Sequence, residues 1–264
     1  METETASGPK RAIRQLKVDA LELRIYAQTD DLMHEAAIIA TEQLRAAIAQ
    51  TGKAAAILAT GNTQLLFLEK LAVQRGLDWS CVTLFHMDEY LGIGGSHPSS
   101  FQTYMREKVA ARVRPGTFHY IAGDALEPIE ECLRYGRLLR AQPIDLCVLG
   151  VGDNGHIAFN DPAVANFEDN YAVKLVRLDE VSRFQQARQG HFRSREEVPL
   201  YALTLTIPAL CSAKRLVCLA TGRHKAAIIS KMLREPVGSV CPASVLRHQP
   251  DALLLLDEEA ASLI

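Results

Sequence analysis

The sequence lacks an excess of charge of either sign, because 29 Lys and Arg residues stand against 31 Asp and Glu residues and the net charge is -2. Such a near-neutral chain has no basic field that would draw a nucleic-acid backbone or an anionic membrane. It also lacks any apolar run near the roughly 18 residues of a membrane-spanning helix. The first residues, METETASGPKR, contain no apolar segment of a signal peptide. We therefore expect a cytoplasmic protein with neither a nucleic-acid nor a membrane partner.

Cysteine pairs with metal-binding or redox spacing are also missing. The six cysteines stand at positions 81, 132, 147, 211, 218 and 241, and no two of them form a C-x-x-C motif. Cys147 and Cys218 lie inside apolar runs, where a thiol behaves as a small apolar side chain. This pattern favours buried free thiols over a zinc site or a disulfide framework.

What the sequence does contain is a regular alternation of short apolar strands and amphipathic helices. The strand candidates are residues 21–27, 54–59, 82–87, 145–150, 173–178, 201–206, 215–220 and 252–256. The helix candidates run from Asp30 or Asp31 to about residue 50, from about 63 to about 74, from about 100 to about 113, from 127 to 142 and from 224 to 234. This alternation is typical of parallel βαβ units. It predicts an α/β fold with a doubly wound, mostly parallel sheet and helices on both faces, a Rossmann-like three-layer sandwich.

No internal repeat, low-complexity segment or linker divides the chain. We expect residues 1–15 to be a mobile N-terminus and residues 16–264 to form a single domain. In sheets of the predicted type, ligands bind beyond the carboxyl ends of the strands. Three turns at such ends carry unusual residues, namely 60–64, 88–95 and 150–162.

Two of these turns partly match nucleotide-binding motifs. Residues 150–155 read GVGDNG and satisfy the G-x-G-x-x-G pattern of a dinucleotide site. However, Pro162 interrupts the chain where a long helix should hold the pyrophosphate, which argues against NAD or FAD. Residues 60–63 lack the Gly-Lys-Ser/Thr ending of a P-loop.

Read together, the turns point to one family. The segments are ATGNT at 59–63, FHMDEYLG at 85–92, SHPSSFQTYM at 96–105 and LGVGDNGHIAFNDP at 149–162. With Lys225 in ATGRHK, they resemble the glucosamine-6-phosphate deaminases of the glucosamine/galactosamine-6-phosphate isomerase family over roughly residues 20–257. The related 6-phosphogluconolactonases tend to carry D-E-R where this chain has DEY at 88–90, and G-H-T-A-S-L-F where it has GHIAFN at 155–160. The resemblance implies conversion of an amino-sugar phosphate into fructose 6-phosphate and ammonia, without a metal or redox cofactor.

The resemblance also assigns catalytic roles. It makes Asp88 the general base that moves a proton from C2 to C1 of the open-chain sugar, and a carboxylate with an unperturbed pKa of about 4 is ionised at neutral pH. It assigns opening of the sugar ring to His156, since imidazole titrates near neutrality. Asn154 and Asp161 are the expected partners of His156. They depart from the family pattern N-D-G-H-I-A-F-N-E-P, because Asp153 and Asn154 stand in swapped order and Asp161 is one methylene shorter than Glu.

The phosphate of the substrate is expected at two helix starts. The resemblance assigns it to a turn whose exposed N–H groups and helix dipole favour an anion, and this turn consists of Gly61, Asn62 and Thr63. Lys225 would add a cation at a second helix start. The family places an Arg against the phosphate, and both Arg183 and Arg188 are candidates here, with Arg188 preferred. The segment at about 160–195, with polar loops and a helix, is expected to form a lid over the site.

Several alternatives remain open at this stage. His156 would activate water if the chain instead hydrolysed the lactone of a 6-phosphosugar. A non-catalytic sugar-phosphate sensor is a third hypothesis, favoured if Asn154 and Asp161 mark lost activity. The sequence fixes neither which amino-sugar phosphate is bound nor whether the chain forms a homo-oligomer.

Overall fold

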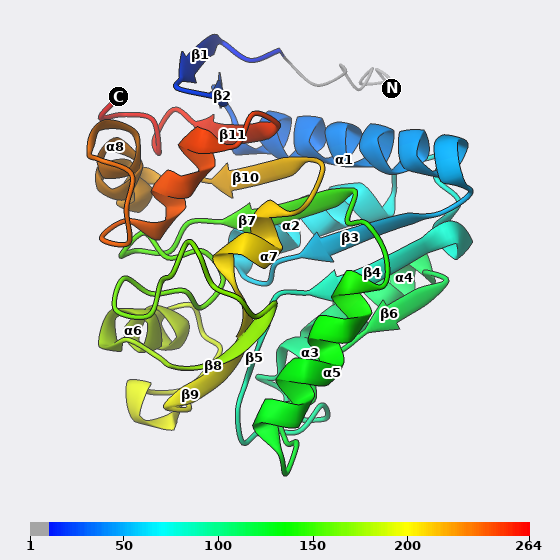
Figure 1. Cartoon of the computed structure of the whole chain (residues 1–264). Helices are drawn as coiled ribbons and strands as arrows, with labels where there is room; N and C mark the ends of the chain where they lie inside the picture. Colours follow the sequence, from blue (N-terminus) through cyan, green and yellow to red (C-terminus); the bar gives the residue numbers. More distant parts are fainter. Residues whose placement is uncertain (1–10) are drawn as a thin grey trace, which may run out of the picture.

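The computed structural model describes residues 11–264 (Figure 1). Most of the expected mobile segment, residues 1–10, lies outside the described residues. The last part of that segment does not, because Arg14 and Gln15 belong to strand β1 (Arg14–Val18), which pairs with its neighbour β2 in an antiparallel register.

The core of the molecule is a mostly parallel sheet formed within residues 11–264. Its strands, in spatial order, are β1, β2 (Leu21–Tyr26), β11 (Ala252–Asp257), β10 (Leu216–Ala220), β7 (Leu146–Gly150), β3 (Ala54–Leu58), β4 (Val82–His86) and β6 (Thr117–His119). Only the pairing of β1 with β2 is antiparallel among these strands. The central strands β3, β10 and β11 are buried along their whole length, as expected for parallel strands covered on both faces.

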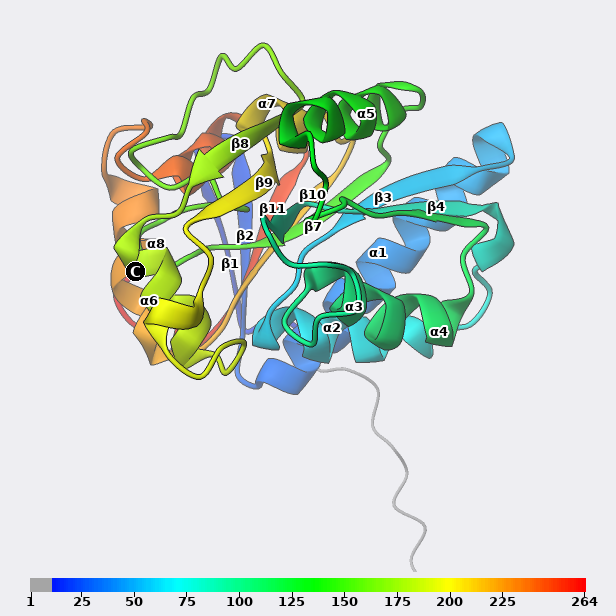
Figure 2. The same ribbon diagram turned by 90° about the horizontal axis from the view of Figure 1, so that it is seen from below.

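Helices cover both faces of this sheet (Figure 2). One face packs against α1 (Thr29–Thr51), α2 (Asn62–Ala72), α3 (Phe101–Met105), a π-helical turn (Arg106–Ala110) and α4 (Ala111–Val113). The other face packs against α5 (Pro128–Arg140), α7 (Ile207–Cys211), α8 (Ala226–Arg234) and a 3-10 helix (Pro242–His248). The remaining 3-10 turns are Trp79–Cys81, Arg195–Glu197 and Arg223–Lys225. The predicted doubly wound, three-layer α/β fold is therefore confirmed.

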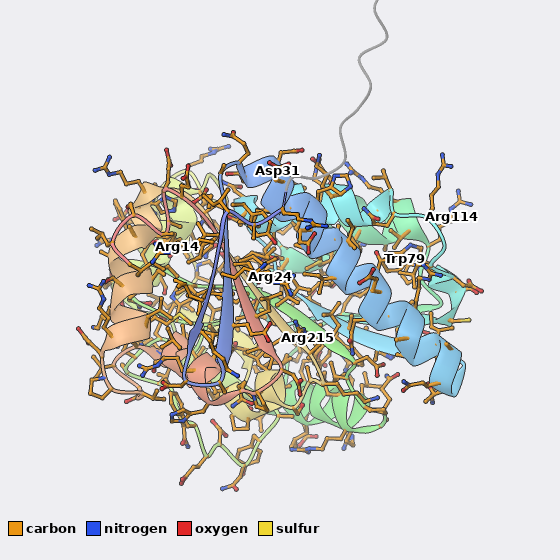
Figure 3. The ribbon with its side chains drawn as sticks, turned by 90° about the horizontal axis from the view of Figure 1, so that it is seen from above. Arg14, Arg24, Asp31, Trp79, Arg114 and Arg215 are labelled. Atoms are coloured by element: carbon orange, nitrogen blue, oxygen red, sulfur yellow. The ribbon has the colours of Figure 1, made fainter. Side chains whose placement is uncertain are left out.

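Helix α1 lies across the strands on its side of the sheet (Figure 3). Arg24 of β2 extends toward it, with its Nη1 atom 3.1 Å from Oε1 of Glu35. The helix begins at Thr29, one residue earlier than the expected Asp30, and its N-cap is Gln28. Asp30 and Asp31 lie instead in its first turn, where negative charge complements the helix dipole.

A second, smaller sheet differs from what the sequence predicts. It consists of β5 (Asp88–Tyr90), β9 (Tyr201–Leu205) and β8 (Val173–Arg177), all paired antiparallel. The strand candidates at 173–178 and 201–206 are real strands, but they pair here and not in the parallel sheet. This sheet packs against its own apolar cluster, which includes Tyr90, Phe101 and Phe159. With α6 (Glu180–Arg188), it forms a wall beside the carboxyl edge of the main sheet (Figure 1).

All six cysteines are free thiols. Four of them are buried, whereas Cys81 and Cys211 are partly exposed. No helix within residues 11–264 is long and apolar enough to cross a membrane.

Candidate active site

A pocket lies where β3, β4, β7 and β10 end. Its lining includes Gly61, Asn62, Thr63, Gln64, Asp88, Phe101, Gly150, Gly152, His156, Phe159, Gln185, Gln186, Gln189, His191 and Lys225. Six of the predicted site residues are in this lining. Asn154 and Asp161 do not line the pocket, but both contact Nδ1 of His156. Arg188 is outside the lining, and its Nη2 contacts the carboxylate of Asp153.

Asp88 occupies the first position of β5, and one residue, Met87, separates it from the end of β4. Its backbone pairs with Thr204 of β9, so the small sheet fixes where the carboxyl group lies. Only 6% of the residue is exposed. This burial, reinforced by the nearby charge of Glu89, raises the pKa of Asp88 to about 8. The pKa of this carboxyl group thus lies above its unperturbed value of about 4, because loss of hydration disfavours the charged form.

Glu89 points the other way and ties the following loop to β5. Its carboxylate accepts hydrogen bonds from the N–H groups of Tyr90, Phe101 and Gln102 and from the hydroxyl of Ser100, at 2.7 to 3.1 Å. Ser100 is also the N-cap of α3. Acidic groups are favourable at a helix start, so this carboxylate joins two elements and leaves Asp88 as the acid that faces the pocket.

His86 is wholly buried at the end of β4 and supports the turn to Asp88. Its Nε2 accepts a hydrogen bond from the N–H of Ile121 at 2.9 Å, so the ring proton lies on Nδ1. Burial lowers the pKa of His86 to about 3, which keeps the ring neutral. The hydroxyl of Tyr135 accepts from the His86 N–H at 3.0 Å and lies 2.9 Å from its carbonyl oxygen.

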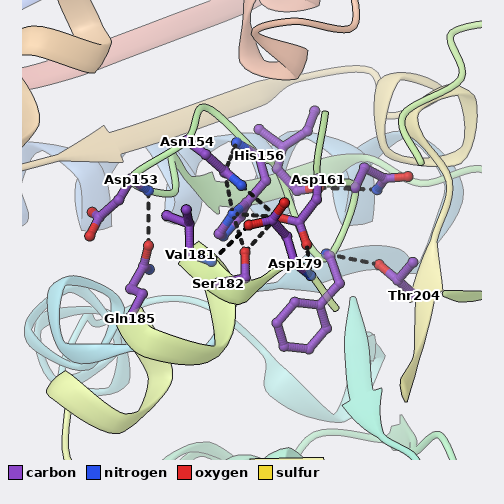
Figure 4. A network of polar contacts seen from close by, with 12 residues as sticks. Asp153, Asn154, His156, Asp161, Asp179, Val181, Ser182, Gln185 and Thr204 are labelled. Carbon is purple, nitrogen blue, oxygen red and sulfur yellow. Dashed lines mark hydrogen bonds and ion pairs between the residues drawn. The ribbon is translucent and has the colours of Figure 1, made fainter. Parts of the chain in front are cut away.

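His156 is held at one ring nitrogen by three oxygens (Figure 4). Its Nδ1 is 2.8 Å from Oδ1 of Asn154, 2.9 Å from Oγ of Ser182 and 3.1 Å from Oδ1 of Asp161. A carboxylate and an amide oxygen accept protons, so Nδ1 carries the proton in the neutral ring. Nε2 is then the nitrogen free to exchange a proton with a bound ligand.

The carboxylate of Asp161 is nearly inaccessible and fully hydrogen-bonded. Oδ1 accepts from Nδ2 of Asn154 at 2.9 Å and from the Ser182 hydroxyl at 2.5 Å, and Oδ2 accepts from the N–H of Asp179 at 3.0 Å. Burial would raise the pKa of Asp161, but its hydrogen bonds and the charge of His156 outweigh burial and lower it to about 2. The shorter side chain therefore does reach the imidazole.

The glycines of the GVGDNG segment shape this turn. A Cβ atom at Gly152 would lie 2.1 Å from the His156 ring, so the imidazole occupies the space that any other residue would need. Gly155 adopts φ +87°, a conformation that L side chains rarely adopt. Instead of a long helix, residues 161–179 continue through loops and β8 to α6. The glycines thus serve the histidine turn.

The predicted phosphate turn lies between β3 and α2. Gly61 precedes α2 with φ +115°, and α2 begins at Asn62. The hydroxyl of Thr63 is 3.1 Å from that of Thr221, which joins this turn to the one after β10. That second turn is fixed by Asp257, whose two carboxylate oxygens are each 3.0 Å from the N–H of Gly222.

Lys225 is the N-cap of α8 and is 7% exposed. Burial lowers the pKa of Lys225, partly offset by its hydrogen bond to Asp153 at 2.7 Å. The other oxygen of Asp153 is 2.5 Å from Nη2 of Arg188. Arg183, the other candidate, is bonded to the carbonyl oxygens of Val198 and Arg195. Of the two arginines, only Arg188 joins the cluster with Lys225.

Two residues of the site were missed from the sequence. Ser182, on α6, bridges His156 and Asp161 but lies 21 residues beyond Asp161, and no motif signals it. Gln64 is buried in the pocket lining, and neither its Oε1 nor its Nε2 has a hydrogen-bond partner among residues 11–264. An amide at the third position of α2, just after the turn, was the available signal. Such an unpaired buried group is rare in proteins and is typical of sites that bind polar ligands.

The chain is similar to known proteins. The family model described as glucosamine-6-phosphate isomerases/6-phosphogluconolactonase matches residues 27–255. A glucosamine-6-phosphate deaminase from Listeria monocytogenes serotype 4a (strain HCC23) is 37% identical over 207 residues, covering 78% of this chain and 86% of the relative.

Solved structures are similar along nearly the whole chain. The structure of a monomeric glucosamine-6-phosphate deaminase gives a TM-score of 0.84 at 30% identity and covers 92% of this chain and 99% of the other. A 6-phosphogluconolactonase from Shewanella baltica OS155 gives a TM-score of 0.75 at 17% identity, over 92% of this chain and 98% of that one. The second likeness is one of fold alone.

Proposed function

The chain belongs to the family of glucosamine-6-phosphate isomerases and 6-phosphogluconolactonases, and we propose that it converts D-glucosamine 6-phosphate and water into D-fructose 6-phosphate and ammonia. The observation that carries this proposal is the pocket in which a buried carboxyl group, Asp88, and a supported imidazole, His156, meet two helix starts. In the comparison of structures, an identity of 30% to a deaminase against 17% to a lactonase favours deamination over lactone hydrolysis.

Ring opening is the first step in this proposal. Nε2 of His156 takes the proton of the C1 hydroxyl and delivers it to the ring oxygen, so that the C1–O5 bond breaks and the aldehyde forms. Asp161 and Asn154 hold Nδ1–H, which keeps Nε2 ready to accept. Support of this kind acts by fixing the tautomer and the orientation of the ring.

Proton transfer follows at the open-chain sugar. The ionised carboxylate of Asp88 removes the proton from C2, and the resulting acid returns it to C1. In the same isomerisation the C1 oxygen gains a proton and becomes a hydroxyl, and the amine at C2 loses a proton and becomes an imine. Water then hydrolyses the imine to the ketone and ammonia. A positioned base of this kind is typically worth about 10²–10⁴ in rate.

The phosphate anchors the sugar at a distance from the reacting carbons. We assign it to Gly61, Asn62 and Thr63, with Lys225 and Arg188 as cations. Contacts of this kind hold C1 and C2 near Asp88. Residues 160–195 are the proposed lid, since α6 contributes Gln185 and Gln186, and its C-cap Gln189, to the lining of the pocket.

Purified protein mixed with D-glucosamine 6-phosphate should release ammonia and fructose 6-phosphate in equal amounts. A panel of hexosamine 6-phosphates assayed in parallel identifies the preferred sugar. Acid release from 6-phosphogluconolactone without ammonia production would instead establish the lactonase, and binding without turnover of either would establish a sensor.

The pH dependence of turnover provides a further prediction. Because Asp88 must be ionised to act as a base and its pKa is raised to about 8, kcat/KM should increase as the pH rises from 6 to about 8. The measurement is ammonia release across this range, alongside an NMR titration of the Asp88 carboxyl carbon, which separates it from titration of the substrate amine. A carboxyl group that titrates near pH 4 would contradict the assignment.

Cytoplasmic location and assembly complete the proposal. Six free cysteines fit a reducing compartment, and a sugar phosphate is a cytoplasmic type of substrate. The formation of a homo-oligomer stays a prediction, which light scattering of the purified chain tests directly.

A further inference from the structure

A carboxylate stands in the middle of the cations that are assigned to the phosphate. Asp153 contacts Nζ of Lys225 at 2.7 Å through Oδ1 and Nη2 of Arg188 at 2.5 Å through Oδ2. Both oxygens of one side chain are thus engaged by the two cations. The charge of this cluster is +1 instead of +2.

The position of Asp153 is fixed from the backbone as well. Its N–H donates to Oε1 of Gln185 at 2.8 Å (Figure 4). Gln185 and Arg188 belong to α6, whereas Lys225 is the N-cap of α8. Asp153 therefore joins the two helices from the turn after β7, and its carboxylate cannot leave the cations without a change of rotamer.

We propose that Asp153 is a built-in competitor of the substrate phosphate, which lowers the affinity of this site for phosphate groups. The inference rests on the proposed function only for the location of the phosphate. A dianion placed against Lys225 and Arg188 lies within a few ångströms of a like charge, and burial at Lys225 weakens the screening of that repulsion by water.

The competing effect is that Asp153 orients both cations before the ligand arrives. Preorganisation saves part of the entropy of ordering two long side chains, but repulsion between a carboxylate and a dianion at close range is the larger effect. The consequence is selectivity. A ligand that contacts the pocket through its sugar overcomes the repulsion, whereas inorganic phosphate alone does not.

Calorimetric titration of the full chain with inorganic phosphate and with fructose 6-phosphate tests the inference. In Asp153→Asn, which keeps the shape and removes the charge, the Kd for inorganic phosphate should fall by about tenfold or more. Asp153→Glu retains the charge and should stay within about threefold of the parent. Asp19→Asn is the matched control, because Asp19 pairs with Nη2 of Arg247 at 2.6 Å outside both the pocket and the proposed lid, and it should change nothing.

Lys225→Met separates this inference from the proposed function. Phosphate binding that is lost in Lys225→Met but not strengthened in Asp153→Asn would overturn the competitor role alone and make Asp153 a positioning residue. Phosphate binding that is unaffected by Lys225→Met would overturn the phosphate site and the competitor role together.

Discussion

Replacement of Asp88 by Asn should reduce ammonia release by about 10³–10⁴-fold, the upper part of the range for a positioned acid or base. The amide keeps the shape of the side chain but can neither take the proton from C2 nor return it to C1. The phosphate contacts are remote from this residue, so the Kd for fructose 6-phosphate should remain within about threefold of the parent value. Single-turnover assays and calorimetry measure the two quantities. Turnover near the parent rate would refute the role of Asp88.

The same variant should be more stable than the parent at alkaline pH. The pKa of Asp88 is raised from 3.8 to about 8 in the folded chain, so the native state binds more protons than the unfolded state between these values. The free energy of unfolding of the parent therefore falls as the pH rises from about 4 to about 8, and Asp88→Asn lacks this loss. Urea denaturation of both proteins at pH 5 and pH 9 measures the difference between their free energies of unfolding, and this difference should be larger at pH 9. A constant difference would mean that the carboxyl group is not desolvated.

Replacement of Asp161 by Ala should lower both turnover and stability. The substitution leaves the His156 ring without its carboxylate and removes the acceptor of Asn154, Ser182 and Asp179. Loss of one partner from a buried charged network typically costs about 3–5 kcal/mol of unfolding free energy. Turnover should fall by about 10²-fold, because His156 loses its orientation. Chemical denaturation and ammonia release are the measurements.

Asp161→Glu is the control that keeps the charge. It should recover most of the turnover that Asp161→Ala loses, although the longer side chain disturbs the contact with Asp179. Acid stability gives an independent readout. Because the pKa of Asp161 is lowered to about 2, its contribution is present above about pH 4 and is lost as the pH falls from 4 toward 2. Asp161→Ala lacks this carboxyl group, so its free energy of unfolding should fall less than that of the parent between pH 4 and pH 2. An equal fall in both proteins would contradict the prediction.

The central strands of the main sheet could be predicted because each is a short apolar run. Runs such as AAAIL in β3 and LLLL in β11 are apolar on both faces, which indicates burial between two layers of helices. The small sheet was not predictable in the same way. Strand β5 consists of Asp88, Glu89 and Tyr90, and it is a strand only because residues more than 100 positions later pair with it. Alternation in sequence predicts a strand but does not name its partner.

Some features of the site could likewise be predicted from the sequence, whereas others depend on contacts between distant segments. Turns that follow a strand directly, at 59–63, 88 and 150–156, could be placed at one edge from strand order alone. The raised pKa of Asp88 depends on how deeply β5 and β9 enclose it, and no local pattern reports that depth. The pairing of Asp153 with Lys225, which are 72 residues apart, and the contact of Ser182 with His156 depend likewise on packing between distant segments.

The two oxygens of Asp161 connect different parts of the molecule. One faces the imidazole and the Ser182 hydroxyl, and the other accepts the N–H of Asp179, the residue that caps α6. A swing of α6 away from the sheet would break the Asp179 contact and withdraw Ser182 from Nδ1 in the same motion. The orientation of the His156 ring therefore depends on the position of α6. With α6 displaced, we expect the protein to bind the sugar phosphate but not to open the sugar ring.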